Sequence, residues 1–431
     1  MKISVIGGAG VRTPLLVSGL THSDLPIEEV ALYDADEERL AIIGKVAARM
    51  SAGARITLCR SVDQCVTGAG FVFTSIRVGG IGRRVLDEAA AQRHGIVGQE
   101  TIGPAGFAMA ARTIPHMVGY AREISRLAPD AWIINFTNPV GMVTEAMRTA
   151  GDRVIGICDT PTELFEEVAH ALGVPSDRCF FDYFGLNHLG WLREVYCDGH
   201  PQLHRLWTDL QRLRAVYRVP LFDPAELTKL RLLPTEYVYY YDQPQRAFDN
   251  VRRAGQTRAQ SIADLTDALF ESLRDPDIDA VPVYRAYLRT RSAGYMQIES
   301  GNEGPTAPSP ASELSGYDKI ALSVVRAIHF NTNAVIPLSV PNRGNICGLR
   351  AEDVVEVPCV VNANGARPMH VGAVPDGVAP LLARVKEYER RTVAAVLAQS
   401  PEAAREALSS NPLVPDRQTA DRLVAELSPL W

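Results

Sequence analysis

Two residues with metal-binding chemistry stand out near the middle of the chain. Cys158 ends the apolar run RVIGIC, and His188 lies in the segment GLNHLGW. A thiolate and an imidazole suit a divalent transition metal, with substrate oxygens completing the coordination sphere. By spacing alone, however, a cysteine at a strand end is more often core packing, and a lone histidine is more often a hydrogen-bonded structural residue. The residues themselves leave both interpretations open.

Groups that could move protons occur beside this pair and further along the chain. Asp159 directly follows Cys158, where it could transfer a proton, orient a metal ligand or cap the helix that Thr160 and Pro161 favour. The segment LPTEYVYYYDQP contains a tyrosine cluster, which is usually core packing. One of these tyrosines could act as a base if a nearby cation lowered its pKa from about 10.

Three polar residues are candidates for contact with an anionic or hydroxyl-rich substrate. Arg84 lies in RVGGIGRRVLDE, Asn138 lies in NFTNPV just past an expected strand, and Arg258 lies in QTRAQ. Each of them, taken singly, also fits a surface arginine or a turn asparagine.

The N-terminus MKISVIGGAG indicates a dinucleotide-binding loop. Glycines between a strand and a helix let the backbone approach a pyrophosphate at the helix N-terminus, although Thr13 stands where the last glycine of the usual pattern belongs. An acid follows about 24 residues later, at the end of LYD, and would bind ribose hydroxyls and favour NAD over NADP. The residues expected to contact NAD are Gly7, Gly8, Ala9, Gly10, Val11, Arg12 and Asp34.

The elements that must position these residues alternate between strand and helix in the first half of the chain. Such alternation predicts an α/β fold with an N-terminal Rossmann-type parallel sheet, and the continuously apolar strands indicate burial on both faces. The expected strands are 2–7, 29–34, 70–78, 131–137 and 153–158, and a helix is expected over 114–128, just before the fourth of these strands.

Helical patterns dominate after about residue 195, which predicts a mainly helical α+β C-terminal domain. We therefore expect an NAD-binding domain at 1–195 and a substrate and oligomerisation domain at 196–431. The segment GNEGPTAPSPAS, at 301–312, indicates a loop beside the site. Helices are expected over 223–233, 261–275, 317–331 and 378–398, and a strand over 353–362.

Composition excludes several classes of protein. The chain has 431 residues, a formal net charge of −6 and 46% hydrophobic residues, without the basic stripe of a nucleic-acid binder. It contains no stretch of about 18 uncharged apolar residues, so a membrane span is not expected. Its seven cysteines are scattered without a CxxC pair, which is typical of reduced thiols and of a cytoplasmic protein.

Long motifs in a fixed order make the chain resemble glycoside hydrolase family 4, most closely its 6-phospho-β-glucosidase branch. The resemblance covers nearly the whole chain and implies a lactate/malate dehydrogenase-like fold. The most specific segments are GQETIGPAGF and INFTNPVG. The others are VIGGAGVRTP, RVGGIGRRVLDE, GICDTP, GLNHLGW, PTEYVYYY and DVVEVPCVV.

The resemblance implies an NAD-dependent hydrolysis of a glycoside, with or without a 6-phosphate. This chemistry is an exception to the two-carboxylate scheme of most glycosidases. NAD takes a hydride from carbon 3 of the sugar, a base removes the acidified proton from carbon 2, and the aglycone leaves carbon 1. Water then adds and the hydride returns. A divalent metal, typically Mn in this family, stabilises the enolate.

The same resemblance assigns roles to individual residues. Cys158 and His188 resemble the metal ligands, Asp159 the proton donor and Tyr237 the base. Arg84, Asn138 and Arg258 resemble substrate contacts, and family likeness suggests a homodimer or homotetramer.

The chain also departs from the family pattern at Ala9 and Gly10, at Gly82 and Arg83, and in RSAGY at 291–295. These departures bear on the sugar and phosphate specificity more than on the mechanism. Two alternatives remain: an NAD-dependent sugar or hydroxy-acid dehydrogenase with net NADH formation, and a non-catalytic NAD-binding regulator.

Overall fold

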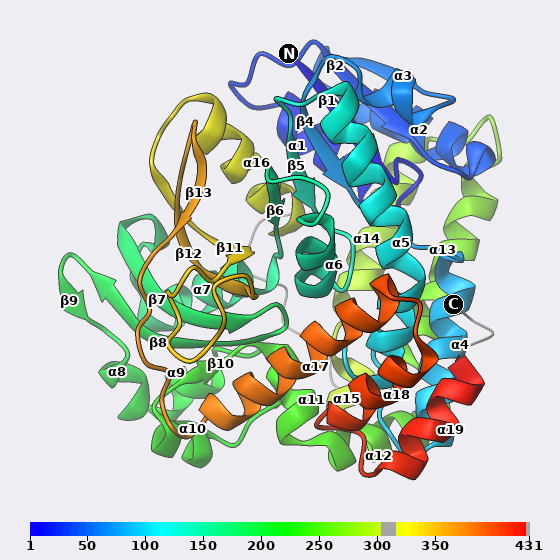
Figure 1. The fold of residues 1–431 in the computed structure, drawn as a ribbon. Coiled ribbons are helices and arrows are strands. Elements are labelled where there is room, and N and C mark those ends of the chain that lie inside the picture. The colour runs from blue at the N-terminus through cyan, green and yellow to red at the C-terminus, as the bar shows by residue number, and fades with distance from the viewer. Residues whose placement is uncertain (303–315, 428–431) are drawn as a thin grey trace.

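The computed structural model describes residues 1–302 and 316–427, and its centre is a nine-stranded sheet (Figure 1). The sheet order is β13-β12-β11-β6-β5-β4-β1-β2-β3. The six strands of its N-terminal half run parallel, in the order of a dinucleotide-binding fold. They are β1 (Lys2–Ile6), β2 (Glu29–Tyr33), β3 (Arg55–Leu58), β4 (Ala69–Thr74), β5 (Trp132–Asn135) and β6 (Val154–Gly156).

Five of these strands confirm the sequence predictions, and β3 was not predicted. The segment RITL of β3 is partly exposed at the sheet edge and lacks the continuous apolar run of a buried strand. The connecting helices are α1 (Thr13–Thr21), α2 (Glu37–Met50), α3 (Val62–Val66), α4 (Gly80–Arg93), α5 (Gly103–Leu127), α6 (Val140–Met147) and α7 (Thr160–Leu172).

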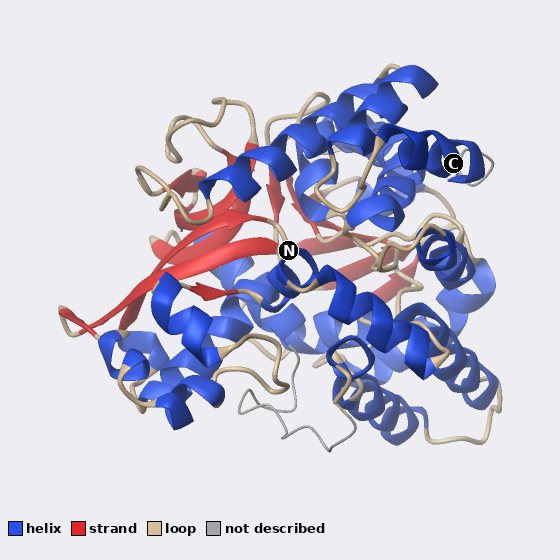
Figure 2. Cartoon of the chain, turned by 90° about the horizontal axis from the view of Figure 1, so that it is seen from below, coloured by secondary structure: helices blue, strands red, loops and turns tan. Residues whose placement is uncertain are grey.

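The C-terminal half of the chain contributes to the same sheet. Three antiparallel strands extend it beyond β6: β11 (Ala334–Pro341), β12 (Val354–Asn362) and β13 (Gly365–Pro368). Seen from below, the strands form one layer with helices above and below it (Figure 2). Each half of the chain therefore builds part of one continuous layer.

A second sheet carries one of the predicted metal ligands. Its main part is the hairpin of β7 (Cys179–Leu186) and β8 (Leu189–Cys197), which packs on β12 and is completed by β9 (His200–Pro201) and β10 (Leu233–Pro234). The sequence analysis did not predict this hairpin. Its two-residue turn contains His188 at a φ of 61°, so the turn presents the imidazole at the end of the hairpin.

Most of the remaining C-terminal segments are helical. All five elements predicted for this half of the chain are observed. The helices predicted at 223–233, 261–275, 317–331 and 378–398 are α10, α13, α16 and α17 of the list below, and the strand predicted at 353–362 is β12. The predicted loop at 301–312 falls largely outside the described residues. The helices are α8 (His204–Trp207), α9 (Leu210–Arg214), α10 (Pro224–Leu230), α11 (Tyr239–Asp242), α12 (Pro244–Ala254), α13 (Arg258–Leu273), α14 (Ala280–Ala293), α15 (Gln297–Ser300), α16 (Gly316–His329), α17 (Ala379–Leu397), α18 (Pro401–Ser410) and α19 (Arg417–Leu427).

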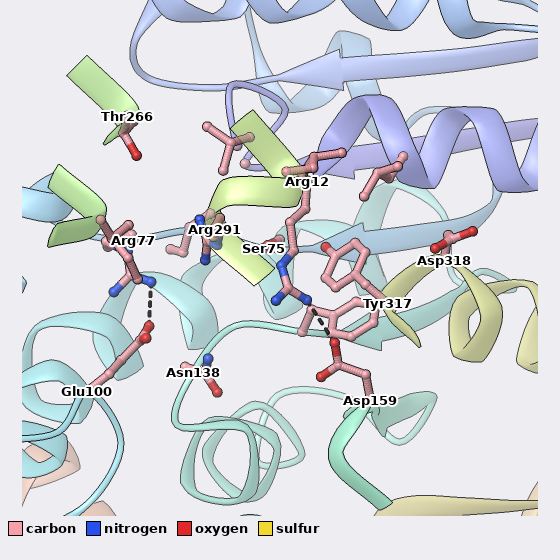
Figure 3. A pocket seen from close by; sticks show the side chains of 18 of the residues that line it. Arg12, Ser75, Arg77, Glu100, Asn138, Asp159, Thr266, Arg291, Tyr317 and Asp318 are labelled. Atoms are coloured by element: carbon pink, nitrogen blue, oxygen red, sulfur yellow. Dashed lines mark hydrogen bonds and ion pairs between the residues drawn. The ribbon is translucent and has the colours of Figure 1, made fainter. Parts of the chain in front are cut away.

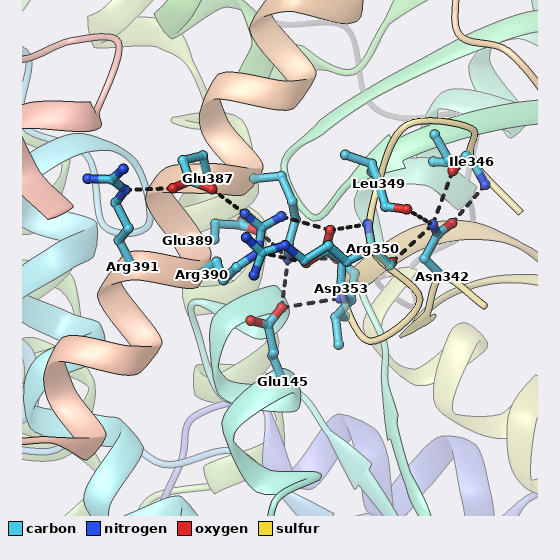
Figure 4. Close-up of polar contacts among 12 residues, drawn as sticks. Glu145, Asn342, Ile346, Leu349, Arg350, Asp353, Glu387, Glu389, Arg390 and Arg391 are labelled. Atoms are coloured by element: carbon cyan, nitrogen blue, oxygen red, sulfur yellow. Dashed lines mark hydrogen bonds and ion pairs between the residues drawn. The ribbon is translucent and has the colours of Figure 1, made fainter. Parts of the chain in front are cut away.

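Helix α17 is joined to the sheet by buried charges. The Lys386 ammonium is fully buried and lies 2.8 Å from both the Glu145 carboxylate of α6 and the Glu389 carboxylate. Further along α17, Arg390 pairs with Asp353 at the start of β12 (Figure 4). These pairs fix α17 against α6 and β12.

All seven cysteines are free thiols, in agreement with the predicted absence of a disulfide framework. Within residues 1–302 and 316–427, no helix has the length and apolar character needed to cross a membrane.

Candidate functional site

A cavity of about 2100 Å³ runs along the carboxyl ends of the parallel strands. This volume exceeds the roughly 300–1,000 Å³ of an ordinary small-molecule pocket and gives room for a dinucleotide together with a second ligand. Every predicted site residue except Gly8 lines it. The structure therefore brings together side chains from segments that are far apart in the sequence (Figure 3).

The glycine loop forms one end of the cavity. Gly7 has a φ of 97°, and a Cβ on it would lie 2.2 Å from the carbonyl oxygen of Ser75, so only glycine fits. Gly8 instead packs against β2, because a Cβ there would lie 2.9 Å from that of Leu32. Helix α1 begins directly after the loop, so its free N-terminal amides suit a pyrophosphate.

Asp34 lies where the sequence predicted a ribose-binding acid. One carboxylate oxygen accepts a hydrogen bond from the Ala9 amide at 3.0 Å, and the other accepts one from the Asp36 amide at 3.1 Å. Burial raises the pKa of Asp34. The carboxylate thus links the glycine loop to the end of β2, and both its oxygens keep lone pairs for hydroxyl donors.

Asp159 and Arg12 form an ion pair across the cavity. The Arg12 guanidinium lies 2.8 Å from the Asp159 carboxylate and packs over the Tyr317 ring at 5.0 Å. Tyr317 in turn stacks on Phe136. The Asp159 side chain makes no capping hydrogen bond to α7, so the alternative role as a helix cap is not observed. Arg12, predicted as a cofactor contact, also holds the predicted proton donor.

Cys158 is buried at the end of β6. Its Sγ lies 4.0 Å from Oδ1 of Asp159, and burial raises the pKa of the thiol well above its usual value. A nearby cation would be needed to stabilise the thiolate form at this position.

His188 and Tyr237 lie face to face. Their rings stack with centroids 3.9 Å apart and an interplanar angle of 3°. Nδ1 of His188 is 2.7 Å from the Thr101 hydroxyl. Burial lowers the pKa of His188 to about 4, so the imidazole is neutral and able to bind a metal at neutral pH.

The tyrosine cluster divides into one candidate base and several packing residues. Tyr239 donates to the Glu299 carbonyl oxygen and Tyr240 to the Met296 sulfur, while Tyr241 packs in the main core. Burial raises the pKa of Tyr237, which agrees with the expectation that a base at this position needs a neighbouring cation.

The predicted substrate contacts have different electrostatic surroundings. Arg84 lies 2.7 Å from the Glu88 carboxylate and 2.6 Å from that of Glu100, which also pairs with Arg77. The charge of Arg84 is therefore already balanced. Arg258 instead donates to the carbonyl oxygen of Arg291 at 2.6 Å, and burial lowers its pKa. Asn138 points into the cavity between Glu100 and Asp159 (Figure 3).

Several lining residues were not identified from the sequence. Gln99 and Glu100 belong to GQETIGPAGF, whose length and specificity were the available signal. Tyr295 donates to Glu236 at 2.8 Å, and burial raises the pKa of Glu236 to about 7. Other charged lining residues that were not predicted include Arg77, Glu163, Arg218, Arg291 and Glu299.

The donor set fits a metal that is shared with a substrate. Cys158 and His188 offer a sulfur and a neutral imidazole nitrogen in the same cavity. No cluster of three or more His, Cys, Asp or Glu side chains suited to a metal occurs in the described part of the chain. With Cys158 and His188 as ligands, the other coordination positions would go to substrate or water.

Comparison with known proteins agrees with this arrangement. The Family 4 glycosyl hydrolase model matches residues 2–174, and the Family 4 glycosyl hydrolase C-terminal domain matches residues 183–414. A probable 6-phospho-beta-glucosidase from Bacillus subtilis (strain 168) is 31% identical over 99% of this chain and 95% of its own length.

Solved structures give the same result. The 6-phospho-beta glucosidase from Thermotoga maritima with NAD and glucose-6-phosphate has a TM-score of 0.85 at 28% identity, covering 100% of this chain and 98% of that one. A second structure of it, with manganese, NAD+ and glucose-6-phosphate, has a TM-score of 0.84 at 27% identity with the same coverage. Malate dehydrogenase from Salinibacter ruber, at 13% identity, has a TM-score of 0.53 over 93% of this chain and 98% of its own. This confirms the predicted dehydrogenase-like architecture. Matches to both family models, together with this cavity, place the chain in family 4 of the glycosyl hydrolases.

Proposed function

We propose that this protein hydrolyses 6-phospho-β-glucosides with the help of NAD and a divalent metal, most simply Mn²⁺. One observation supports this above the others: Cys158, Asp159, His188 and Tyr237 line the same cavity as the glycine loop. The relatives named 6-phospho-beta-glucosidases, and the T. maritima structures with NAD and manganese, support the substrate class and both groups.

When bound, NAD supplies a hydride acceptor for carbon 3 of the sugar, and the metal supplies positive charge beside the oxygens of carbons 2 and 3. Cys158 and His188 are the residues that would hold the metal. Asp159 gives a proton to the oxygen that leaves carbon 1. Arg12 orients the Asp159 carboxyl through their ion pair.

Tyr237 removes the proton from carbon 2. Its ring stacks on the ring of His188, the imidazole that would hold the metal. The phenol is neutral in this buried environment, and a cation held by the neighbouring imidazole stabilises the phenolate that the reaction needs.

The 6-phosphate would be bound by arginines whose charge is not already balanced. Among the described residues, Arg258 and Arg291 have no carboxylate within ion-pair distance, whereas Arg84 has two. A phosphate dianion would therefore contact Arg258 and Arg291, and Arg84 would shape the pocket around the sugar.

An assay of aryl glycosides tests the proposal. The substrates are 4-nitrophenyl β-glucoside and α-glucoside, each with and without a 6-phosphate, incubated with NAD, Mn²⁺ and a thiol reductant. We expect release of the phenol from the phosphorylated β-glucoside without net NADH, and loss of this activity in Cys158→Ser. Net NADH formation with stoichiometric oxidation of a sugar or hydroxy acid would replace the proposal with the dehydrogenase alternative. Binding of NAD without any turnover would favour the regulator.

The location and assembly of the protein belong to the same proposal. A metal held by Cys158 requires that this thiol stays reduced, in keeping with the expected cytoplasmic location. We also infer that the protein works as a homodimer or homotetramer, as its family likeness suggests, on a small-molecule glycoside and without nucleic acid or membrane.

A further inference from the structure

The imidazole of His188 is held by a hydrogen-bonded chain in the wall of the cavity. Nδ1 lies 2.7 Å from the Thr101 hydroxyl, and that hydroxyl lies 2.9 Å from Oε1 of Gln99. His188, Thr101 and Gln99 are all buried. Gln99 and Thr101 belong to the loop between α4 and α5. Thr101 precedes His188 by 87 residues in the sequence.

The direction of each hydrogen bond follows from a backbone amide. The Thr101 N–H donates to Oε1 of Gln99 at 2.7 Å, so this atom must be the amide oxygen and not the nitrogen. An amide oxygen only accepts, so the Thr101 hydroxyl donates its single hydrogen to Gln99. The hydroxyl is then an acceptor toward His188, and Nδ1 must carry the hydrogen.

A neutral imidazole with a hydrogen on Nδ1 has its lone pair on Nε2. His188 lines the cavity, and Nε2 has no hydrogen-bond partner among the described residues. The ring is also fixed in orientation, because it stacks on Tyr237 at 3.9 Å. The chain from Gln99 through Thr101 therefore leaves the nitrogen that faces the cavity ready to bind a cation.

We propose that Thr101 and Gln99 are positioning residues that hold His188 as its Nδ1–H tautomer, so that Nε2 is the metal ligand. This inference rests on the proposed function, because it requires His188 to bind the metal. Partners of this kind set the tautomer and orientation of a metal-binding histidine, and their loss typically costs about 10- to 100-fold in metal affinity.

The loop that contains these two residues also contacts the arginines of the cavity. Glu100 lies between Gln99 and Thr101 and pairs with both Arg77 and Arg84. One short segment thus holds the metal ligand on one side and the Arg84 side chain on the other.

The test measures Mn²⁺ binding without turnover, with NAD present and sugar absent. The electron paramagnetic resonance signal of free Mn²⁺ reports how much of the metal is unbound. Thr101→Val removes the hydroxyl at nearly constant volume, and we expect about 10- to 100-fold weaker Mn²⁺ binding. Thr101→Ser keeps the hydroxyl and is expected to stay within about threefold of the unaltered protein. NAD affinity and the thermal-unfolding midpoint show that each variant is folded.

Gln99 gives the second arm of the test. In Gln99→Leu the Thr101 hydroxyl is free to donate to Nδ1, which favours the wrong tautomer and weakens Mn²⁺ binding. Because Gln99 acts through Thr101, we expect the double variant to bind no more weakly than Thr101→Val alone.

The outcomes separate this inference from the proposed function. Unchanged affinity in Thr101→Val, or equal losses in the Val and Ser variants, would overturn the tautomer role while leaving the metal site in place. Unchanged affinity in His188→Ala would overturn both, because the metal would then not be bound by this imidazole.

Discussion

Individual side chains in the cavity are positioned by partners that come from distant segments. Arg12 follows the glycine loop and forms an ion pair with Asp159, and Tyr237, from the turn that follows β10, stacks on His188 at the tip of the β7–β8 hairpin. The alignment of the proposed proton donor, base and metal ligands therefore depends on pairwise contacts between segments. Removal of one partner should therefore lower the catalytic rate more than it lowers the stability of the fold.

The role of Tyr237 as base gives the first prediction at this scale. Tyr237→Phe keeps the ring that stacks on His188 but removes the hydroxyl, so we expect turnover of the phosphorylated β-glucoside to fall about 10²- to 10⁴-fold. NAD binding, measured by fluorescence titration, should stay unchanged. Tyr241→Phe is the control, because Tyr241 packs in the core and does not line the cavity. Full activity of Tyr237→Phe would exclude Tyr237 as the base.

Sequence motifs point to individual candidate residues, but they do not predict the contacts between those residues. Cys158, His188 and Tyr237 lie in recognisable segments, and the structure places all three in one cavity, while their roles stay predictions. The pairing of Arg12 with Asp159 spans 147 residues, and that of Thr101 with His188 spans 87. No spacing rule along a chain encodes such contacts, because they arise only when strands and hairpins meet.

At the scale of elements, the β7–β8 hairpin and helix α17 matter most for the site. The hairpin contains His188, and Glu356 on β12 joins it to the central sheet by accepting hydrogen bonds from Tyr183 at 2.8 Å and from Asn187 at 3.2 Å. The hairpin was missed because its strands mix glycines, aromatic residues and charges. The long amphipathic α17 was predicted well because its apolar spacing is regular over nineteen residues.

The carboxyl group of Glu356 leads to a prediction about pH. Burial raises its pKa to about 7, whereas a glutamate in an unfolded chain titrates near about 4.3. Between these values the unfolded chain loses the proton and the folded chain keeps it, so the free energy of unfolding falls as pH rises toward 7. This loss amounts to at most about 4 kcal/mol and is complete above pH 7.

Glu356→Gln cannot ionise, so it lacks this part of the pH dependence. We expect the stability of the variant relative to the unaltered protein to increase from pH 5 to pH 7 and then to level off. Thermal-unfolding midpoints over this interval measure the difference. A difference that is constant with pH would show that Glu356 is already ionised at pH 5.

The buried ammonium of Lys386 gives a prediction about packing. Lys386→Met leaves the Glu145 and Glu389 carboxylates close together and buried without their cation, which should destabilise the fold by about 3–5 kcal/mol. Chemical denaturation monitored by circular dichroism tests this. Lys229→Met is the matched control, because Lys229 is 82% exposed and its loss should be nearly neutral. Equal stability of the two variants would contradict the importance of this ion-pair cluster for docking α17.

At the scale of the whole molecule, the alternation of strands and helices was enough to predict the class of fold. The predicted boundary at residue 195 stays a prediction, and it falls within β8. The sequence did not reveal that β11, β12 and β13 complete the nucleotide-binding sheet. Their apolar patterns identify strands but not neighbours, and strand order depends on contacts across the chain.

Assembly is the prediction that belongs to this scale. We expect two or four copies per particle when the purified protein is measured by light scattering coupled to size-exclusion chromatography. A single copy that turns over the phosphorylated β-glucoside would show that the cavity of one chain is sufficient for activity.

The return of the chain to its first sheet has a further consequence for evolution and for engineering. Since β11 pairs with β6, a gene fragment that encodes only the first 195 residues would produce a protein in which β6 is an unpaired edge strand that is prone to aggregation. We therefore expect that this fragment cannot serve as an independent cofactor-binding module. In this architecture the N-terminal strands and β11–β13 must be kept in the same chain.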